Sequence, residues 1–323
     1  MQKILLDVRD LSVRFFTRKN DVPAVENVSF HINDGEVLGI VGESGSGKSV
    51  SALSIIGLIQ EPGRITGGRI VFKDENLLEK SEEEMTNIRG NKISMIFQEP
   101  MTSFNPVYTV GGQIMEAIAL HQNKKKLQAR ELTVSLMREV GIASPEKRIS
   151  DYPHQMSGGM LQRCMIAMAL SCNPELLIAD EPTTSLDVTI QAQILDLIRK
   201  LQHERNTSII MITHDLGIIA ELAKYVVVMY LGRVVEKAPV RELFRKPLHP
   251  YAEGLLRSRT VIGQNGGKLY MIPASNMDPR DIEGCRFCPR CEFAFDRCKI
   301  AEPPLTEIGD GRSVRCWLRL LEK

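Results

Sequence analysis

The sequence has no hydrophobic run long enough to cross a membrane. Its longest apolar stretches, around Leu176 to Ala179 and Tyr225 to Leu231, have the length of single strands, whereas a membrane span needs about 18 to 20 apolar residues. An amino-terminal signal peptide is not expected either, because a charge at Asp7 arrives before a hydrophobic region can form. We therefore expect a chain that does not itself span the membrane.

The sequence also has almost no net charge, no internal repeat and no low-complexity tract. Lysine and arginine total 41 against 40 aspartate and glutamate residues, for a net charge of +1. This balance gives no global bias toward nucleic acid, although it leaves local patches open. A length of 323 residues with 43% hydrophobic residues predicts a globular protein of about two domains.

The most informative segment reads GESGSGKS and fits the pattern G-x-x-x-x-G-K-[ST]. It follows the apolar stretch Val37 to Val41 and precedes a helix-like segment from Val50 to Leu58. Glycines let backbone N–H groups turn toward phosphates, and the helix terminus adds the positive end of its dipole. We expect Lys48 to neutralise β- and γ-phosphate charge and Ser49 to bind Mg²⁺. The predicted nucleotide-binding residues here are Gly42, Glu43, Ser44, Gly45, Ser46, Gly47, Lys48, Ser49 and Val50.

Strand and helix patterns alternate along most of the chain. The pattern is strand-like from Ile4 to about Phe30 and becomes helical between Thr109 and Ser171, which predicts an inserted helical subdomain. Beyond it, apolar strands alternate with a helix, as in a buried parallel sheet. The remaining strands are expected at residues 69–72, 92–97, 176–180, 208–213, 225–230 and 233–237, and a short helix at 250–257.

Three strand ends carry candidate catalytic side chains. The apolar strand 176–180 ends in Asp180, suited to Mg²⁺, and is followed by Glu181, suited to an attacking water. His214 follows another strand and can contact the γ-phosphate, and Gln98 follows the strand 93–97 and can meet Mg²⁺ or water. Taken singly, each has a structural reading as well: an acid-capped strand, a satisfied loop histidine and a strand-end turn.

The segment Met156 to Met160, followed by Gln162 and Arg163, resembles the signature motif of the ABC-transporter ATPase family. With the motifs above, the resemblance covers residues 1 to about 255. It implies an α/β fold, a P-loop NTPase (ABC ATPase) core with an inserted helical subdomain at about 100–172. The resemblance also implies a role for each residue. Gln98 would be the Q-loop, Asp180 the end of the Walker B strand and Glu181 the catalytic carboxylate. Residues 185–187 would form the D-loop, His214 would be the switch histidine, and Phe15 would stack on adenine, with Phe16 as the alternative.

The signature departs from its commonest form at two positions, which bears on the branch of the family that the chain resembles. Met156 replaces leucine and Met160 replaces glutamine. These changes leave intact the Ser157 hydroxyl and the Gly158 and Gly159 amides, which the family uses to hold the γ-phosphate across a dimer. The segments QEPMTSFNPV, from Gln98, and PLHPY, from Pro247, are similar to those of the oligopeptide, dipeptide and nickel importer branch, in which methionine at position 160 is usual.

The resemblance implies partners that this chain does not contain. It implies a head-to-tail ATPase dimer with a second ATPase subunit, two membrane permease subunits docking near residues 99–110, and an extracytoplasmic solute-binding protein. The chain would lie at the cytoplasmic face of the cell membrane as a peripheral subunit, and no nucleic acid is expected.

Five of the seven cysteines lie in the last forty residues, with the spacing C-x2-C-x2-C-x6-C and one more thiol beyond. Four thiols suffice for zinc or for a 4Fe-4S cluster, and the irregular gaps without histidine favour the cluster. We divide the chain into an ATPase domain at 1–259 and a cysteine-rich metal or iron–sulfur domain at 260–323. The tail also resembles the carboxyl-terminal extension of peptide-importer ATPases, which implies the ligands Cys285, Cys291, Cys298 and Cys316, with Cys288 as the alternate ligand.

Three functions are compatible with these motifs to different degrees. The leading one is an ATPase that energises import of di- and oligopeptides, or of a related ligand such as nickel. The alternative is a soluble ABC ATPase acting on nucleic acid or ribosomes with a zinc-binding tail, but the tail has no basic run and the chain has only one cassette. A P-loop kinase or GTPase would have no use for the residues 157–160.

Overall fold

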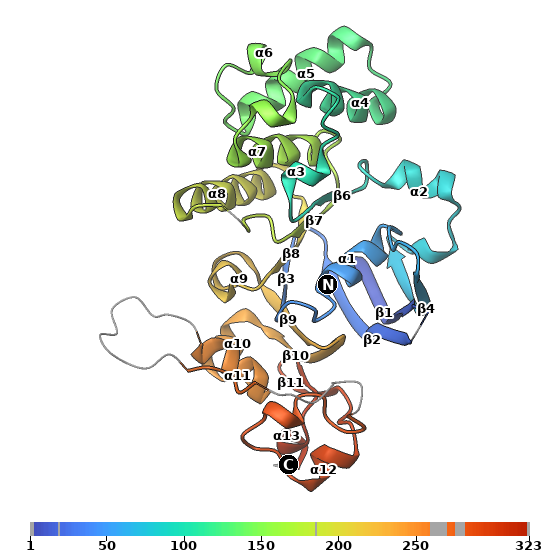
Figure 1. Cartoon of the computed structure of the whole chain (residues 1–323), viewed down its shortest axis with the longest axis vertical. Coiled ribbons are helices and arrows are strands. Elements are labelled where there is room, and N and C mark those ends of the chain that lie inside the picture. Colours follow the sequence, from blue (N-terminus) through green and yellow to red (C-terminus); the bar gives the residue numbers. More distant parts are fainter. Residues whose placement is uncertain (1–2, 19, 185, 259–269, 275–281, 322–323) are drawn as a thin grey trace.

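The computed structural model describes residues 3–18, 20–184, 186–258, 270–274 and 282–321 (Figure 1). The molecule is elongated. Helices from the middle of the sequence lie at one end of its long axis, and residues 282–321, called here the carboxyl-terminal segment, lie at the other. No helix within these ranges is both long and apolar enough to cross a membrane.

An eight-stranded sheet forms the body of the molecule. Its strand order is β11-β12-β10-β9-β3-β8-β7-β6. The run from β9 to β6 is parallel, and β10, β12 and β11 add to it in antiparallel fashion. The strands are β3 (Val37–Val41), β6 (Ile93–Ile96), β7 (Leu176–Asp180), β8 (Ser208–Thr213), β9 (Tyr225–Tyr230), β10 (Arg233–Pro239), β11 (Thr306–Gly309) and β12 (Arg312–Val314).

A smaller antiparallel sheet lies to one side, with the order β2-β1-β4-β5. Its inward side chains share one buried cluster with one face of the large sheet and with Ala52 and Ile55 of α1 (Lys48–Ile55). The helix that follows the phosphate loop is therefore held by both sheets. The strands are β1 (Ile4–Phe16), β2 (Asp21–Asn33), β4 (Gly63–Phe72) and β5 (Glu75–Asn76).

Successive side chains of the central strands point alternately into two hydrophobic cores, one on each face of the large sheet. Ile210 and Ile212 of β8 face the smaller sheet, whereas Ile209 and Met211 face the helices on the other side. A strand buried on both faces needs apolar residues at every position, which explains the unbroken apolar run in the sequence. The helices that contribute to the second core include α8 (Val188–Arg205), α9 (Leu216–Leu222), α10 (Val240–Arg245) and α11 (Pro250–Arg257).

A group of helices separates β6 from β7 in the sequence, where the sequence predicts the helical subdomain. It forms the end of the molecule opposite the carboxyl-terminal segment (Figure 1). The helices are α3 (Pro100–Ser103), α4 (Val110–Gln122), α5 (Lys126–Glu139), α6 (Pro145–Arg148), the 3₁₀ turn η2 (Pro153–Gln155) and α7 (Gly158–Ala169). Between β5 and β6 lie η1 (Leu77–Glu79) and α2 (Glu82–Ile88).

The carboxyl-terminal segment is attached to the edge of the large sheet. Within it, β12 pairs with β10, and the guanidinium of Arg312 contacts Glu236, a fully buried residue of β10. This attachment is not evident in the sequence, and the expected domain boundary near residue 260 lies outside the described residues. The other elements of the segment are η4 (Cys288–Arg290), α12 (Asp296–Ile300) and α13 (Trp317–Leu321).

Candidate active site

The candidate catalytic residues lie where parallel strands end. The phosphate loop follows β3, Gln98 follows β6, Glu181 follows β7, and His214 follows β8. Since these strands are parallel neighbours, their carboxyl ends meet at one edge of the sheet, the usual place for a ligand in an open α/β fold.

The phosphate loop needs glycine at two positions for reasons visible in the backbone. Gly42 has φ of 157°, and a Cβ there would lie 2.2 Å from the carbonyl oxygen of Met229. Gly47 has φ of 96°, and its Cβ would lie 2.8 Å from the carbonyl oxygen of Ala24. The loop is therefore shaped by contacts with β9 and β2, which only glycine permits without displacement.

Lys48 lies at the first turn of α1, and its side chain is directed back into the loop. Its ammonium donates to the carbonyl oxygens of Gly42 and Glu43, both at 2.9 Å. Burial lowers the pKa of Lys48, while the nearby carboxylates of Glu181 and Asp180 oppose that shift. The ammonium therefore lies beside the acidic pair, at the mouth of the loop that would receive phosphates.

Ser49 and Asp180 form a pair suited to Mg²⁺. Asp180 is 5% exposed, its carboxyl accepts a hydrogen bond from Ser49, and its Oδ1 atom is buried without a hydrogen-bond partner. Burial raises the pKa of Asp180, with the Glu181 charge adding to the effect. A buried carboxylate oxygen without a partner, beside a serine hydroxyl, is the hard oxygen donor set that Mg²⁺ takes in phosphate-binding proteins.

The Glu181 carboxylate brings together the other predicted catalytic residues. Its Oε2 atom accepts from Gln98 Nε2 at 3.3 Å and from the Thr184 hydroxyl at 2.8 Å, and it lies 3.3 Å from His214 Nδ1. Glu181 has φ of 46°, an uncommon backbone conformation for a side-chain-bearing residue that often marks a functional site. Its side chain is 14% exposed, whereas that of His214 is 64% exposed.

The signature residues lie apart from this cluster. Ser157 caps α7, with its hydroxyl accepting from the Met160 N–H at 3.3 Å, and Gly158 begins the helix. Within the described residues, no hydrogen bond or ion pair joins Ser157, Gly158 or Gly159 to the phosphate loop of the same chain. Of the predicted D-loop, Asp187 caps α8 through the Ile190 N–H, while Ser185 lies outside the described residues.

The two candidate adenine-stacking rings occupy different environments. Phe15 is half-buried and packs against the core between the sheets, whereas Phe16 is 46% exposed. The stacking role of Phe15 stays a prediction, and the more accessible ring is that of Phe16. A cavity of about 650 Å³ lies beside the loop, with Gly45, Gly47 and Val50 among its lining residues, a size typical of ligand pockets.

Sequence reasoning missed three residues that contact this site. Thr184 reaches Glu181, as described above. Tyr251 Oη accepts from the backbone N–H of Glu43 at 2.8 Å, and the Arg290 guanidinium makes two hydrogen bonds to the Glu43 carboxylate, at 2.8 and 3.0 Å. No local signal marks Arg290, which is 247 residues from Glu43, although Tyr251 belongs to the PLHPY segment noted above.

The five carboxyl-terminal cysteines surround one small cavity of about 20 Å³. Burial raises the pKa of the Cys285 thiol to about 12 and that of Cys291 to about 11, and it also raises the pKa of Cys288 and Cys316. In the part of the chain that the structure describes, no three histidine, cysteine, aspartate or glutamate side chains are arranged to hold a metal ion. The geometry thus does not support the expected metal site as it stands.

Comparison with protein families matches two parts of the chain. Residues 25–184 match the model described as ABC transporter. Residues 235–298 match the model described as oligopeptide/dipeptide transporter, C-terminal region. The first match includes the phosphate loop, Gln98, the signature and Glu181, and the second includes Tyr251, Arg290 and four of the cysteines.

The chain is also similar over nearly its whole length to known relatives. It is 53% identical to the oligopeptide transport ATP-binding protein AppD of Bacillus subtilis, covering 97% of this chain and 96% of the relative. It is 49% identical to the dipeptide transport ATP-binding protein DppD of Escherichia coli, again covering 97% and 96%.

Solved structures resemble the ATPase part of the fold. The ATP-binding cassette MJ0796, as a post-hydrolysis dimer bound to ADP and Pi, has a TM-score of 0.66 at 25% identity, covering 73% of this chain and 99% of that one. The protein cbiO1 of Clostridium perfringens, part of the transporter complex cbiONQ, has a TM-score of 0.64 at 26% identity, covering 76% and 92%.

Proposed function

This chain belongs to the ABC transporter family, among its oligopeptide and dipeptide transport ATP-binding proteins, and we propose that it hydrolyses ATP to drive import of short peptides. The observation that carries the proposal is the convergence of Gln98, Thr184 and His214 on Glu181, beside a phosphate loop, in a chain about half identical to peptide-transport ATPases. A related ligand such as nickel is the second candidate cargo.

We assign the chemistry at the site as follows. The loop amides and Lys48 bind the β- and γ-phosphates, and Lys48 exchanges its contacts with loop carbonyls for phosphate oxygens. Mg²⁺, when held by Ser49 and Asp180 with Gln98, supplies positive charge against the developing negative charge on the phosphates. Glu181 takes the proton of the attacking water, and His214 orients that water against the γ-phosphate.

We further propose that two cassettes form each complete ATP site. The nucleotide bound on the opposite cassette is then contacted by Ser157, Gly158 and Gly159. In the described residues, no hydrogen bond or ion pair joins these three to their own phosphate loop. The solved relative MJ0796 is a dimer bound to ADP and Pi, which supports this arrangement. A second, different ATPase subunit is the expected partner.

The remaining partners follow from the transport role. We propose that two membrane permease subunits dock beside the Q-loop, near residues 99–110, where Met101, Val107 and Tyr108 are exposed, and that a solute-binding protein delivers the peptide from outside. The chain would then be a peripheral subunit on the cytoplasmic face of the membrane.

Co-purification tests this proposal against the nucleic-acid alternative. The Glu181→Gln chain, tagged and expressed in its own host, is purified in mild detergent with Mg²⁺ and ATP. We expect two integral membrane proteins and a second ATPase subunit to co-purify, and the peptide-binding protein to stimulate ATP hydrolysis by the complex that the wild-type chain forms. Recovery of nucleic acid or ribosomes without membrane proteins would contradict the transport role.

We also propose that Cys285, Cys291, Cys298 and Cys316 hold a 4Fe-4S cluster, with Cys288 as the alternate ligand. The support is chemical: five cysteine side chains line one cavity, and thiolates are the ligands that hold iron–sulfur clusters. When bound, the cluster would hold together a segment that has little core of its own.

Metal analysis of protein purified without oxygen decides this question. We expect near-stoichiometric iron and sulfide with a broad visible absorbance, lost on substitution by serine at 285, 291, 298 or 316 and retained in Cys288→Ser. One zinc without iron would establish zinc as the cofactor instead. Protein that contains neither iron nor zinc would contradict the proposal.

A further inference from the structure

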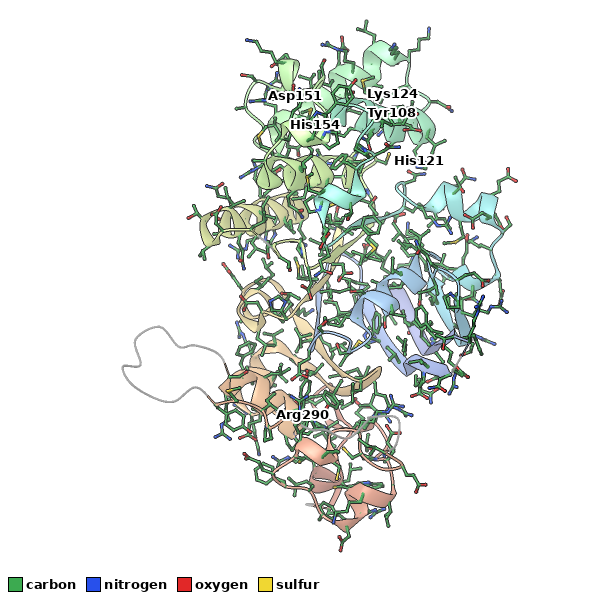
Figure 2. All side chains as sticks on the ribbon, in the orientation of Figure 1. Tyr108, His121, Lys124, Asp151, His154 and Arg290 are labelled. Atoms are coloured by element: carbon green, nitrogen blue, oxygen red, sulfur yellow. The ribbon has the colours of Figure 1, made fainter. Side chains whose placement is uncertain are left out.

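A side chain of the carboxyl-terminal segment contacts the phosphate loop directly. Arg290 Nη1 and Nη2 donate to the two carboxylate oxygens of Glu43, at 2.8 and 3.0 Å. Glu43 is the second residue of the loop, so this paired hydrogen bond joins the cysteine-rich segment to the element that receives the nucleotide phosphates. Figure 2 shows Arg290 where that segment meets the body of the molecule.

Arg290 is fixed on its own side by several contacts. It ends η4, between Cys288 and Cys291, and its Nε donates to the carbonyl oxygen of Pro273 at 2.7 Å. Its guanidinium also donates to the Tyr230 hydroxyl at 3.3 Å and lies 6.0 Å from the ring centre of Phe287. When a guanidinium is held at several points, its two Nη groups have one orientation. Little side-chain conformational entropy is then lost when they pair with a carboxylate.

The backbone of Glu43 is equally well fixed. Its N–H donates to Tyr251 Oη at 2.8 Å, and its carbonyl oxygen accepts from Lys48 at 2.9 Å. These two contacts fix the backbone of the residue whose carboxylate pairs with Arg290.

A second arginine of the segment reaches the same region. Arg286 donates to the carbonyl oxygen of Leu231 and pairs with Glu26, and Gly232, which follows Leu231, donates its N–H to the carbonyl oxygen of Ser46 at 2.9 Å. Arg286 also lines the cavity of about 650 Å³ beside the loop. The carboxyl-terminal segment therefore reaches the phosphate loop directly through Arg290 and indirectly through Arg286 and the backbone of residues 231–232.

The contact with Arg290 offsets the negative charge of Glu43 next to the place where nucleotide phosphates would bind. A carboxylate in the loop repels the phosphates of an incoming nucleotide, and a paired guanidinium cancels that charge at short range. The Glu43 side chain is 39% exposed and that of Arg290 17% exposed, so solvent weakens the effect without removing it.

We propose that Arg290 is a positioning residue for the phosphate loop: it neutralises Glu43 and holds it away from the nucleotide, so that the carboxyl-terminal segment sets the affinity of the ATPase for ATP. The inference rests on the ATPase activity assigned above. It gives the segment a role in nucleotide binding that is separate from any cofactor held by its cysteines.

Charge-neutral substitutions on either side of the contact test the proposal. We expect Arg290→Gln to weaken Mg-ATP binding about fivefold, the size of a partly exposed charge contact, because the Glu43 charge is left uncompensated. Glu43→Gln should tighten binding several-fold, since Arg290 then faces the phosphates alone. The double variant should return to within about twofold of wild type, because the two changes remove opposite charges and their effects on binding have opposite signs and similar sizes. Affinity is measured by calorimetry with Mg-ATP in the Glu181→Gln background.

Steady-state kinetics and a matched control separate positioning from general damage. In the otherwise wild-type chain, Arg290→Gln should raise the KM for ATP and leave kcat within about twofold. Arg297→Gln, in the same segment with its guanidinium 3.7 Å from the Trp317 ring centre, should leave both unchanged. Thermal unfolding without nucleotide confirms that each variant is folded.

Two results would overturn the inference. One is wild-type affinity in folded Arg290→Gln, and the other is a double variant at least as weak as Arg290→Gln, which is the result expected of a purely structural contact. Failure of the Glu181→Gln parent to bind ATP would instead reject the ATPase assignment, so the two failures are distinguishable.

Discussion

Glu181 is the residue on which the proposed chemistry depends most. Its Oε2 atom has three partners, from the ends of β6 and β8 and from its own loop, and its left-handed backbone places it beyond the end of β7. A carboxylate surrounded in this way is positioned to accept a proton from water while the neighbouring side chains hold its orientation.

Glu181→Gln should abolish turnover and preserve nucleotide binding. The amide keeps the shape of the carboxylate but cannot accept the proton, so we expect kcat to fall by at least about 10²-fold with ATP affinity retained. Phosphate release and equilibrium ATP binding measure the two effects. Lys48→Ala is the informative contrast, because it should weaken binding itself. Near-normal hydrolysis by Glu181→Gln would remove the residue from the catalytic role.

At the scale of single residues, motif spacing predicted the phosphate loop and the residues at the strand ends, because each stands next to an apolar strand in the sequence. Contacts between distant segments were not predictable. Thr184 resembles any loop threonine, and Arg290 pairs with Glu43 only because the chain folds back on the loop after β10. Nothing local in the sequence distinguishes such residues.

At the scale of elements, a buried ion pair fastens the carboxyl-terminal strands to the large sheet. Glu236 of β10 is fully buried and accepts from the backbone N–H groups of Leu248 and His249 and from Arg312 of β12, the last at 3.2 Å. Removal of one partner from such a pair leaves a buried charge without compensation.

Arg312→Ala should therefore destabilise the protein by roughly 3–5 kcal/mol, the usual cost of breaking a buried pair. Limited proteolysis should then cut first near β11 and β12, and thermal unfolding should begin at lower temperature. Ser313→Ala, on the same strand, is the control and should change stability by less than about 0.5 kcal/mol. Equal stability of the two variants would show that the pair does not hold the strands.

The central strands were readily predicted because their unbroken apolar runs are needed to fill two cores at once. The attachment of β12 was not, since a strand of three residues, Arg312–Val314, carries too little periodicity to be recognised. Pairing with β10 and the Glu236 contact decide its place, and both are long-range.

At the scale of the whole molecule, the placement of the signature relative to the phosphate loop underlies our proposal that two cassettes share each ATP site. Ser157 lies in the helical subdomain, whereas the loop lies beside α1 and the smaller sheet. In that proposal, closure of two cassettes on ATP converts nucleotide binding into motion at the membrane subunits.

Ser157→Arg should block closure without affecting the binding of ATP to the same chain. The bulky charged side chain would stand where the opposite γ-phosphate is expected, so we predict monomers at saturating ATP and loss of hydrolysis. In the Glu181→Gln background and with the second ATPase subunit present, sedimentation with Mg-ATP should show association for the chain that keeps Ser157 and none for the chain that also carries Ser157→Arg. Association by both would contradict the shared-site arrangement.

Peptide uptake by the living host tests the central claim most directly. Cells carrying the wild-type chain and cells carrying Glu181→Gln at the same level are compared for accumulation of labelled di- and tripeptides under conditions in which this transporter is the main route. The account predicts accumulation with the wild-type chain and loss of it with the variant, although both chains reach the membrane. Equal peptide uptake by the two strains would contradict an ATPase that drives peptide import.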